Sequence, residues 1–233
     1  MSLLSASGLA KAYDGIHAVN GVDLDVAAGE MVAMIGPNGA GKSTCFALLC
    51  GQIRPDCGRI QLDGRDITAL SPGHRARWGL GRTFQVAQVF ASMTVAENLA
   101  VAARGKDAPS VLDRIGLAGI ADHPAATLAY GDVKRLELAL ALATRPRVLL
   151  MDEPTAGMAP TERQALMALI ADLAREGKLA VLFAEHDMDV VFGHADRILV
   201  LDRGKLIAAG TPAVIRADPR VRAVYLGHGA GGC

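Results

Sequence analysis

The sequence predicts an α/β domain in which helices cover a mainly parallel sheet. Short apolar runs alternate along the chain with segments of helical periodicity, as they do in repeated strand and helix units. The 233 residues are 51% hydrophobic, so the chain can bury one sizeable core. The clearest predicted strands cover residues 18–26, 31–35, 147–151 and 179–184.

Helix starts are marked by capping residues and prolines. A capping box places a hydroxyl residue three positions before an acid or amide, and three such patterns precede apolar periodicity: Thr94 with Glu97, Ser110 with Asp113, and Thr161 with Gln164. Thr211-Pro212 and Asp218-Pro219 each place a cap before a first-turn proline and predict two short C-terminal helices. Between residues 87 and 127 the strand signal disappears and alanine-rich helical sequence dominates. This segment is therefore predicted to be a helical insertion in the α/β core.

The segment from Gly36 to Thr44 reads GPNGAGKST and fits the pattern GxxxxGK[ST]. It follows the apolar run 31–35, and residues 42–50 read as the next helix. In such a loop the glycines let backbone N–H groups turn toward phosphate, Lys42 adds a positive charge, and Ser43 offers a hydroxyl to Mg²⁺. The helix directs its positive N-terminal end at the anion. The sequence therefore predicts a nucleoside triphosphate site, because a glycine-rich surface turn would not need this context.

Two acids, Asp152 and Glu153, end the apolar run 148–151. Neighbouring side chains leave a strand in different directions, so one carboxylate can face a metal ion while the next lies beside an attacking water. We therefore expect Asp152 to be a metal ligand and Glu153 to be the general base. The alternative is a strand followed by a solvated acidic turn, which the phosphate loop disfavours.

Composition limits the setting in which the chain works. Lys plus Arg and Asp plus Glu number 24 each, so no net field attracts nucleic acid or an anionic membrane. No apolar run approaches the roughly 20 residues of a membrane-spanning helix, and the N-terminus lacks a signal-peptide pattern, so we expect a cytoplasmic protein. The four cysteines have neither zinc-site spacing nor the density of a secreted disulfide framework, and Cys45 and Cys50 are expected to be reduced and packed.

The order of these and further features resembles that in the ATP-binding subunits of ABC transporters. The phosphate loop is followed by Gln85, by the segment LAYGD at 128–132, by the strand that ends in two acids, and by His186. The resemblance covers essentially the whole chain. It implies a P-loop NTPase of the ABC ATPase type, with a mainly parallel sheet core, an antiparallel β region and a helical subdomain. The implied organisation is one domain over 1–233, with a core at about 1–86 and 136–226, a helical subdomain at about 87–135 and a flexible tail at 227–233.

The resemblance also implies roles for single residues. Tyr13 corresponds to the aromatic residue that stacks on adenine, with Val19 as a weaker candidate for the same pocket. Gln85 corresponds to a glutamine that contacts Mg²⁺ or its water, and His186 to a histidine that binds the γ-phosphate; with Glu153 they form the expected catalytic set. The expected ATP-binding residues are Tyr13, Val19, Asn38, Gly39, Ala40, Gly41, Lys42, Ser43, Thr44 and Gly131, and the expected Mg²⁺ ligands are Ser43, Gln85 and Asp152.

The LAYGD segment departs from the usual LSGGQ sequence, which in this family caps the ATP bound to the opposite subunit. Ala129 replaces the serine and Tyr130 the first glycine, so Gly131 and the helix dipole remain as the phosphate-facing features. Asp132 stands where glutamine is usual, and an acid that pointed at phosphate would be unfavourable. We therefore expect Asp132 to serve as a first-turn charge of a helix over 133–143.

Several motifs resemble one branch of the family, the ATPases of branched-chain amino acid importers. Urea and short-amide importers have closely similar ATPases, and the segment 99–128 is shorter than expected for this branch. Ala159 stands where most family members carry an aspartate that bridges two subunits. The motifs are RTFQ at 82–85, MTVAENL at 93–99, LAYG at 128–131, RLE at 135–137 and DEPTAGM at 152–158.

The resemblance implies an ATPase that powers a membrane importer, with ATP and Mg²⁺ as cofactors. Its expected partners are permease subunits, a second ATPase subunit that is a copy or a paralogue, and an extracytoplasmic solute-binding protein, with no nucleic acid. Two subunits would sandwich two ATP molecules, close on the γ-phosphate and reopen after hydrolysis, and this motion would reach the permease on the inner face of the cell membrane. The alternatives are an exporter ATPase of the lipid or lipopolysaccharide type and a soluble ABC ATPase outside transport.

Overall fold

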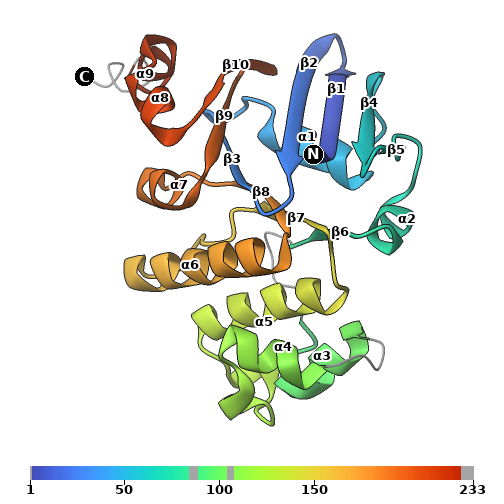
Figure 1. Cartoon of the computed structure of the whole chain (residues 1–233), viewed down its shortest axis with the longest axis vertical. Coiled ribbons are helices and arrows are strands. Elements are labelled where there is room, and N and C mark those ends of the chain that lie inside the picture. Colours follow the sequence, from blue (N-terminus) through green and yellow to red (C-terminus); the bar gives the residue numbers. More distant parts are fainter. Residues whose placement is uncertain (1, 84–88, 104–107, 227–233) are drawn as a thin grey trace.

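Two β-sheets and several layers of helices make up the computed structural model, which describes residues 2–83, 89–103 and 108–226 (Figure 1). The first sheet contains β1 (Ser2–Tyr13), β2 (Ile16–Ala27), β4 (Cys57–Leu62) and β5 (Arg65–Asp66), paired antiparallel in the order β2-β1-β4-β5. The second contains β3 (Met31–Ile35), β6 (Leu80–Arg82), β7 (Val148–Asp152), β8 (Ala180–Ala184), β9 (Arg197–Asp202) and β10 (Lys205–Gly210). Its order is β10-β9-β3-β8-β7-β6, and its pairs are parallel except for β10 with β9.

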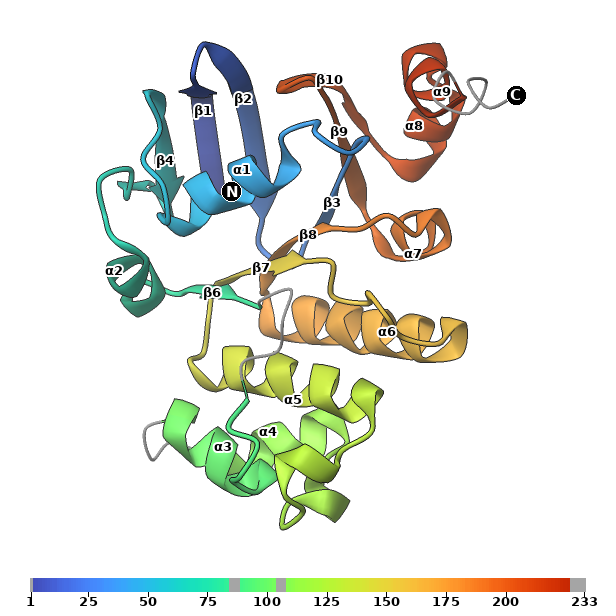
Figure 2. The ribbon, with the colours of Figure 1, turned by 180° about the vertical axis from the view of Figure 1, so that it is seen from behind.

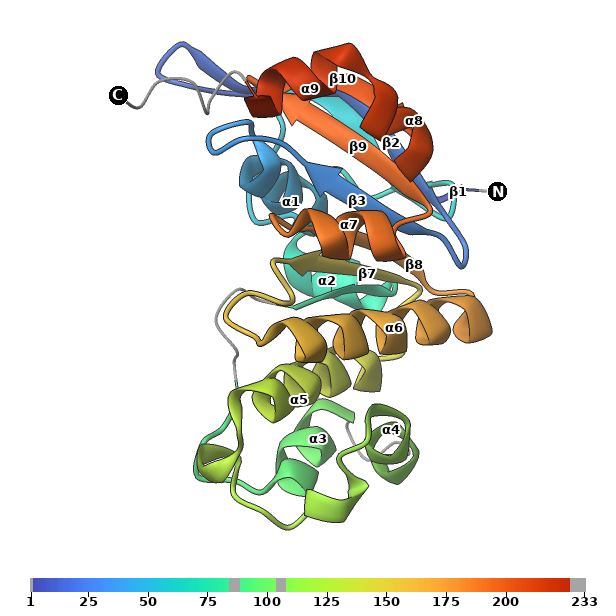
Figure 3. The same cartoon turned by 90° about the vertical axis from the view of Figure 1, so that its left-hand side faces the viewer.

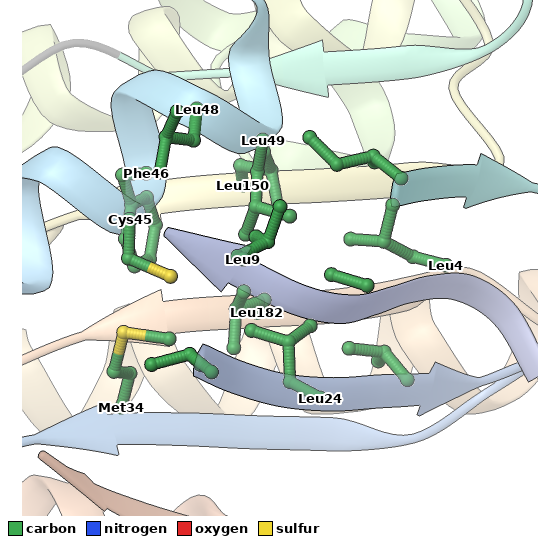
Figure 4. Close-up of a cluster of buried hydrophobic side chains, with 14 of the residues drawn as sticks. Leu4, Leu9, Leu24, Met34, Cys45, Phe46, Leu48, Leu49, Leu150 and Leu182 are labelled. Carbon is green, nitrogen blue, oxygen red and sulfur yellow. The ribbon is translucent and has the colours of Figure 1, made fainter. Parts of the chain in front are cut away.

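Helix α1 (Lys42–Cys50) fills the space between the two sheets (Figure 4). Phe46 and Leu49 are fully buried in one cluster with Leu9 of β1 and Leu150 of β7. Because α1 is packed on both sides, most of its residues are apolar and its sequence shows no polar stripe. The helix that follows the phosphate loop is thereby fixed against both sheets.

A buried arginine holds the C-terminal end of α1. Arg75 lies in the short helix α2 (Pro72–Arg77), is 1% exposed, and its Nη1 donates to the carbonyl oxygens of Leu48 and Leu49, both at 2.7 Å. The last carbonyls of a helix have no partner within it, so this guanidinium caps them. Burial lowers the pKa of Arg75, and the surrounding carbonyl oxygens satisfy its N–H groups.

A second core lies on the opposite face of the six-stranded sheet, between the sheet and the helices that cover it in Figure 3. Successive residues of a strand point to opposite faces, so Met31, Ala33 and Ile35 of β3 join this core, whereas Val32 and Met34 join the cluster around α1. This two-sided burial is the reason that β3 reads as a continuous apolar run. The helices that cover this face are α6 (Pro160–Gly177), α7 (Met188–His194), α8 (Pro212–Ala217) and α9 (Pro219–Leu226).

A helical region lies at the far side of α6 from the sheet (Figures 1 and 2). It has its own apolar core, in which Leu99, Leu112 and Leu136 are buried. Helix α5 (Tyr130–Ala143) belongs to two cores, because its Leu138 packs in the core beneath the sheet. The expected boundary at 135/136 therefore falls inside one continuous helix. The region contains α3 (Val95–Ala103), α4 (Ala108–Ile115), the 3₁₀ turns η1 (Ala118–Ile120) and η2 (Ala125–Thr127), and α5 (Tyr130–Ala143).

Three of the predicted helix starts are confirmed. Thr94 precedes α3 and forms a reciprocal capping box, in which the Thr94 N–H donates to Glu97 Oε2 at 2.8 Å and the Glu97 N–H donates to Thr94 Oγ1 at 3.1 Å. Helix α8 begins at Pro212 directly after Thr211, and α9 begins at Pro219 directly after Asp218. Asp132 lies in the first turn of α5, as expected.

Three other starts were predicted wrongly. Helix α4 begins at Ala108, so Ser110 lies inside it, because Pro109 fits the first turn of a helix. Helix α6 begins at Pro160, and Glu162 closes its start by accepting the N–H of Ala159 at 3.2 Å, so Thr161 is not its cap. The third error is α5, which was expected over 133–143 and begins at Tyr130.

Two expectations about composition can be compared with the structure. Cys45 and Cys50 are free and buried, as predicted, whereas Cys57 is exposed. None of the described helices is both long and apolar enough to cross a lipid bilayer.

Candidate functional site

The phosphate loop runs from β3 into α1 and closes tightly on its neighbours. Gly41 has φ 103°, a conformation that L side chains rarely adopt, and a Cβ at this position would collide with the carbonyl oxygen of Ala18 in β2. A Cβ at Gly36 would likewise collide with the carbonyl oxygen of Leu201 in β9. Both glycines are therefore required by close backbone approach, and Ala18 is brought to the mouth of the loop.

Lys42 is the first residue of α1, and its side chain turns back along the loop. Its Nζ donates to the carbonyl oxygens of Gly36 at 2.7 Å and Pro37 at 3.2 Å. The residue is buried, and burial lowers the pKa of its ammonium group. The negative charges of Glu153 and Asp152 raise this pKa, but their effect is smaller. A phosphate anion beside the ammonium would favour its charged form and offset this cost. The loop therefore holds a partly desolvated cation at the position where phosphate is expected.

The carboxyl end of β7 presents Asp152 to the same loop. Burial raises the pKa of the Asp152 carboxyl, and the opposing influence of Arg82, with its Nη2 3.9 Å from Oδ2, is weaker. The adjacent Glu153 also raises this pKa by like-charge repulsion. A cation beside Asp152 would stabilise the ionised form of this carboxylate.

Glu153 contacts His186 across the ends of two neighbouring strands. His186 Nε2 lies 3.0 Å from Glu153 Oε1, and the two side chains come from the turns after β7 and β8. The backbone of Glu153 has φ 51°, in the left-handed region, and its N–H donates to the carbonyl oxygen of Ala184 at 2.9 Å. A non-glycine residue in this region costs on the order of 1 kcal/mol and is typical of functional sites. The turn thus constrains the backbone of Glu153, and the carboxylate lies beside His186.

A buried carboxylate that the sequence did not identify links the same two turns. Glu185 is 4% exposed, and its Oε1 accepts hydrogen bonds from Thr155 Oγ1 at 2.6 Å and from the Thr155 N–H at 2.8 Å. Its Oε2 accepts the His186 N–H at 3.2 Å. A glutamate directly after a fully buried strand is the signal that could have indicated it, because a buried acid needs partners.

These groups surround one cavity of about 360 Å³. Its volume lies within the roughly 300–1,000 Å³ that small-molecule sites occupy. The predicted site residues on its wall come from the phosphate loop, from β7 and the following turn, and from the turn after β8. The complete lining consists of Ala18, Asn38, Gly39, Gly41, Lys42, Ser43, Thr44, Asp152, Glu153 and His186.

The cavity offers few ligands to a metal ion. Within residues 2–83, 89–103 and 108–226, no group of three or more His, Cys, Asp or Glu side chains could hold a metal alone. Ser43 and Asp152 nevertheless lie on one cavity wall and supply a hydroxyl and a carboxylate. Mg²⁺ is usually held by one or two protein oxygens and completes its shell with water and substrate phosphate. These two residues fit Mg²⁺ that arrives with a nucleotide.

Residues 19–156 match a protein-family model described as ABC transporter. This chain belongs to the ABC transporter family. A second model, described as branched-chain amino acid ATP-binding cassette transporter, matches residues 205–231. The predicted family is confirmed, and this ABC protein is an ATP-hydrolysing subunit.

Curated relatives resemble this ABC protein over nearly its whole length. The high-affinity branched-chain amino acid transport ATP-binding protein BraF of Pseudomonas aeruginosa is 43% identical, with 97% of this chain and 98% of the relative covered. The protein LivG of Escherichia coli K12, which bears the same description, is 41% identical with the same coverage. The lipopolysaccharide export system ATP-binding protein LptB of Acidithiobacillus ferridurans is 40% identical, with 97% of each chain covered.

Solved structures share the fold. The ADP conformation of MJ1267, an ATP-binding cassette of an ABC transporter, superposes with a TM-score of 0.89 at 30% identity and covers 97% of this chain and 99% of its own. The structure of cbiO1 from Clostridium perfringens, part of the transporter complex cbiONQ, gives a TM-score of 0.86 at 32% identity, with 97% and 95% covered. The predicted fold class, including its antiparallel β region and helical part, is confirmed.

Two residues expected at the nucleotide have side chains that are buried in the core of this ABC protein. Val19 is fully buried in the core around α1, and the cavity is lined instead by the preceding residue, Ala18. Its assignment to the adenine pocket is therefore wrong, because alternate residues of β2 face opposite sides and Val19 faces the core. The Ala40 side chain also belongs to that core, so only its backbone remains available to the loop.

Two further predicted residues, Tyr13 and Gly131, are not among those that line the cavity. Tyr13 ends β1 and is 47% exposed, with Lys11 Nζ 5.6 Å from the centre of its ring, and its stacking on adenine stays a prediction. Gly131 lies in the first turn of α5, and its contact with the ATP of another subunit stays a prediction. Gln85 and the tail at 227–233 lie outside the described residues.

Proposed function

We propose that this chain is the ATPase subunit of an importer for branched-chain amino acids and that it works on the inner face of the membrane, bound to permease subunits. The importer motifs, the match over residues 205–231 and the names of the relatives BraF and LivG support the substrate class. The catalytic part of the proposal rests on one observation, the 3.0 Å contact between His186 Nε2 and Glu153 Oε1 at the cavity. Related small polar solutes such as urea and short amides belong to the same proposal.

In this function the phosphate loop and Lys42 bind the triphosphate. The first N–H groups of α1 have no partner within the helix and point at the anion. Ser43 and Asp152 would hold Mg²⁺, which draws negative charge from the phosphates when it is bound. Gln85, outside the described residues, is proposed as a further contact of the metal.

Glu153 orients a water molecule toward the γ-phosphate and accepts its proton. His186 holds the Glu153 carboxylate and contacts the γ-phosphate, so the two turns form one catalytic unit. Because the left-handed backbone of Glu153 is fixed by the Ala184 carbonyl, little reorganisation is needed during reaction.

The proposed active form is a pair of ATPase subunits. Gly131 and the start of α5 lie outside the cavity of their own chain, so a second copy or a paralogue would present these groups to the γ-phosphate. The pair closes on ATP and reopens after hydrolysis, and the helical region passes this motion to the permease. An extracytoplasmic solute-binding protein completes the proposed system.

An exporter ATPase is the second candidate. The 40% identity to LptB, which is described as part of a lipopolysaccharide export system, is only slightly below the 43% identity to BraF. The separate match of residues 205–231 to a branched-chain amino acid cassette favours the importer.

Uptake by vesicles tests both parts of the proposal. The chain is purified with its permease and placed in lipid vesicles with its ATP side inward. ATP is enclosed in the vesicles, and labelled leucine and the solute-binding protein are added outside. We expect ATP-dependent leucine transport, and failure of transport with intact ATPase activity would reject the substrate class. Capture of lipopolysaccharide by the same complex would favour the exporter.

Glu153→Gln tests the catalytic assignment. The glutamine keeps the shape and the contact with His186 but cannot accept a proton at neutral pH. We expect kcat to fall by about 10²–10⁴-fold, as for removal of a general base, while ATP still binds. Glu176→Gln is the matched control, because Glu176 is exposed and pairs only with Arg114 among the interactions that the structure gives for it, at 3.1 Å. Retained turnover in Glu153→Gln would show that another group is the base.

A further inference from the structure

Tyr130 joins the helical region to the turn that carries Glu153. It is the first residue of α5, and its hydroxyl donates to the carbonyl oxygen of Ala156 at 2.9 Å. Its ring lies against Gly157, where an added Cβ would come within 3.1 Å of the ring Cε1. Gly157 has φ 80°, so the turn at this point is suited to glycine both by conformation and by space.

The acceptor of this bond is part of a tightly connected segment, residues 153–158, which we call the catalytic turn. The N–H of Ala156 donates to the carbonyl oxygen of Glu153 at 3.2 Å, and the N–H of Met158 donates to that of Thr155 at 3.1 Å. Thr155 is in turn held by the buried carboxylate of Glu185. A single residue, Ala156, therefore links the Tyr130 hydroxyl bond to the backbone of the proposed base.

The same end of α5 also packs closely on α6. An added Cβ at Gly131 would lie 3.0 Å from Oε1 of Glu162, in the first turn of α6. Lys134 is buried, and its Nζ lies 5.8 Å from the centre of the Tyr130 ring and 3.5 Å from Glu137 Oε2. Lys134 therefore supports the ring from within α5. The start of α5 thus rests on the catalytic turn and on α6 through several close contacts.

We propose that Tyr130 is a positioning residue that couples the two ATP sites of a subunit pair. This inference rests on the proposed pairing, in which the start of α5 covers the ATP of the partner while the catalytic turn acts on the ATP of its own subunit. The hydroxyl bond makes these two surfaces move together. Binding of ATP beneath α5 in one site therefore sets the position of Glu153 in the other.

Mixed pairs show whether Tyr130 acts on the catalytic turn of its own copy or on the ATP that it covers. Two differently tagged copies of the chain are assembled, one with intact Glu153 and one with Glu153→Gln, so that a single site hydrolyses ATP. Tyr130→Phe, which keeps the ring on Gly157 and removes the hydroxyl, is placed either in the copy with intact Glu153 or in the other copy. ATP turnover is measured against ATP concentration for each arrangement.

The expected result is a three- to tenfold lower kcat, with unchanged KM for ATP, only when Tyr130→Phe is in the copy that carries the intact Glu153. The loss of one hydrogen bond corresponds to a factor of this size. An effect only when the variant is in the other copy would assign Tyr130 to the ATP that it covers and overturn the proposal. Equal effects in both copies, or none, would also overturn it.

Two controls isolate the cause. Thr127→Val removes a hydroxyl that donates to the carbonyl of Pro124 at 2.8 Å within the helical region, and we expect it to leave kcat unchanged in both arrangements. The melting temperature of Tyr130→Phe should match that of the wild type, because the bond is exposed. Pairing and ATP hydrolysis of wild-type copies are measured before any Tyr130 variant is compared. If wild-type copies did not pair or did not hydrolyse ATP, the proposed function itself would fail.

Discussion

Thr155→Val removes one hydroxyl from the buried link between the turns that follow β7 and β8. The hydroxyl donates to Oε1 of Glu185 at 2.6 Å, and both residues are nearly inaccessible to solvent, at 1% and 4% exposure. Valine has nearly the same shape as threonine, so the substitution leaves no large cavity. Its effect therefore reports mainly on the lost hydrogen bond to a carboxylate.

The magnitude follows from burial and from the remaining partners. A hydrogen bond to a charged group contributes about 1.5–3 kcal/mol. Glu185 keeps the N–H groups of Thr155 at 2.8 Å and His186 at 3.2 Å, so we expect a loss in the lower part of this range, about 2 kcal/mol. For a chain of this length each kcal/mol shifts the melting temperature by about 2–4 °C, so Tm should fall by about 4–8 °C.

A double-mutant cycle measures whether the two side chains act together. Urea unfolding is measured for Thr155→Val, for Glu185→Gln and for the double variant. We expect a coupling energy of about 1 kcal/mol, because the charge-assisted bond can be lost only once. Thr144→Val is the control: Thr144 is an exposed residue whose hydroxyl donates to the Ala141 carbonyl at 2.8 Å, and we expect a change within about 0.5 kcal/mol.

Additive effects would refute the reasoning. If the coupling energy stayed within about 0.3–0.5 kcal/mol of zero, the Thr155 hydroxyl and the Glu185 carboxylate would not stabilise each other. An equally large loss in Thr144→Val would show that any threonine hydroxyl has this effect, whatever its partner.

Lys42→Ala should weaken ATP binding by at least tenfold in a nucleotide titration, because it removes the buried ammonium held in the phosphate loop. Unchanged affinity would contradict that placement. Lys205→Ala, at an exposed position, is the control. Iodoacetamide at pH 8 should modify Cys57 in the folded protein and leave Cys45 and Cys50 intact, as judged by peptide mass spectrometry. Burial raises the pKa of these two thiols to about 12 and about 11, and modification of Cys45 as fast as Cys57 would show that α1 is less well packed than the structure indicates.

The parallel sheet could be predicted because its central strands are buried on both faces. Strands β3 and β8 are wholly buried and read as unbroken apolar runs. Strand β1 was not singled out, since one face of its sheet is partly exposed and its pairing with β2 shifts register several times. These shifts interrupt the alternation of polar and apolar residues on which strand prediction depends.

The site was predictable where its residues share one local motif. The phosphate loop, Asp152 and Glu153 come directly after strands, and parallel strands bring their carboxyl ends to the same edge. Ala18 was missed because its place depends on the close approach of Gly41, which only the folded chain defines. Val19 was chosen instead, and a shift of one residue in a strand exchanges the two faces.

The link between Thr155 and Glu185 depends on the order of strands. Thirty residues separate the two in sequence, and they meet because Asp152 of β7 pairs with Ala184 of β8. No local pattern in the sequence records which strands become neighbours. For this reason the supporting carboxylate became visible only in the folded chain.

At position 153 the residue that favours stability differs from the residue that favours catalysis, because the backbone there is left-handed. At φ 51° glycine would relieve strain, whereas glutamate keeps the conformation only because the surrounding turn enforces it. A search for more stable variants would therefore favour glycine at this position and would discard the proposed base at the same time. Selection for folding alone and selection for turnover would drive this single position toward different residues.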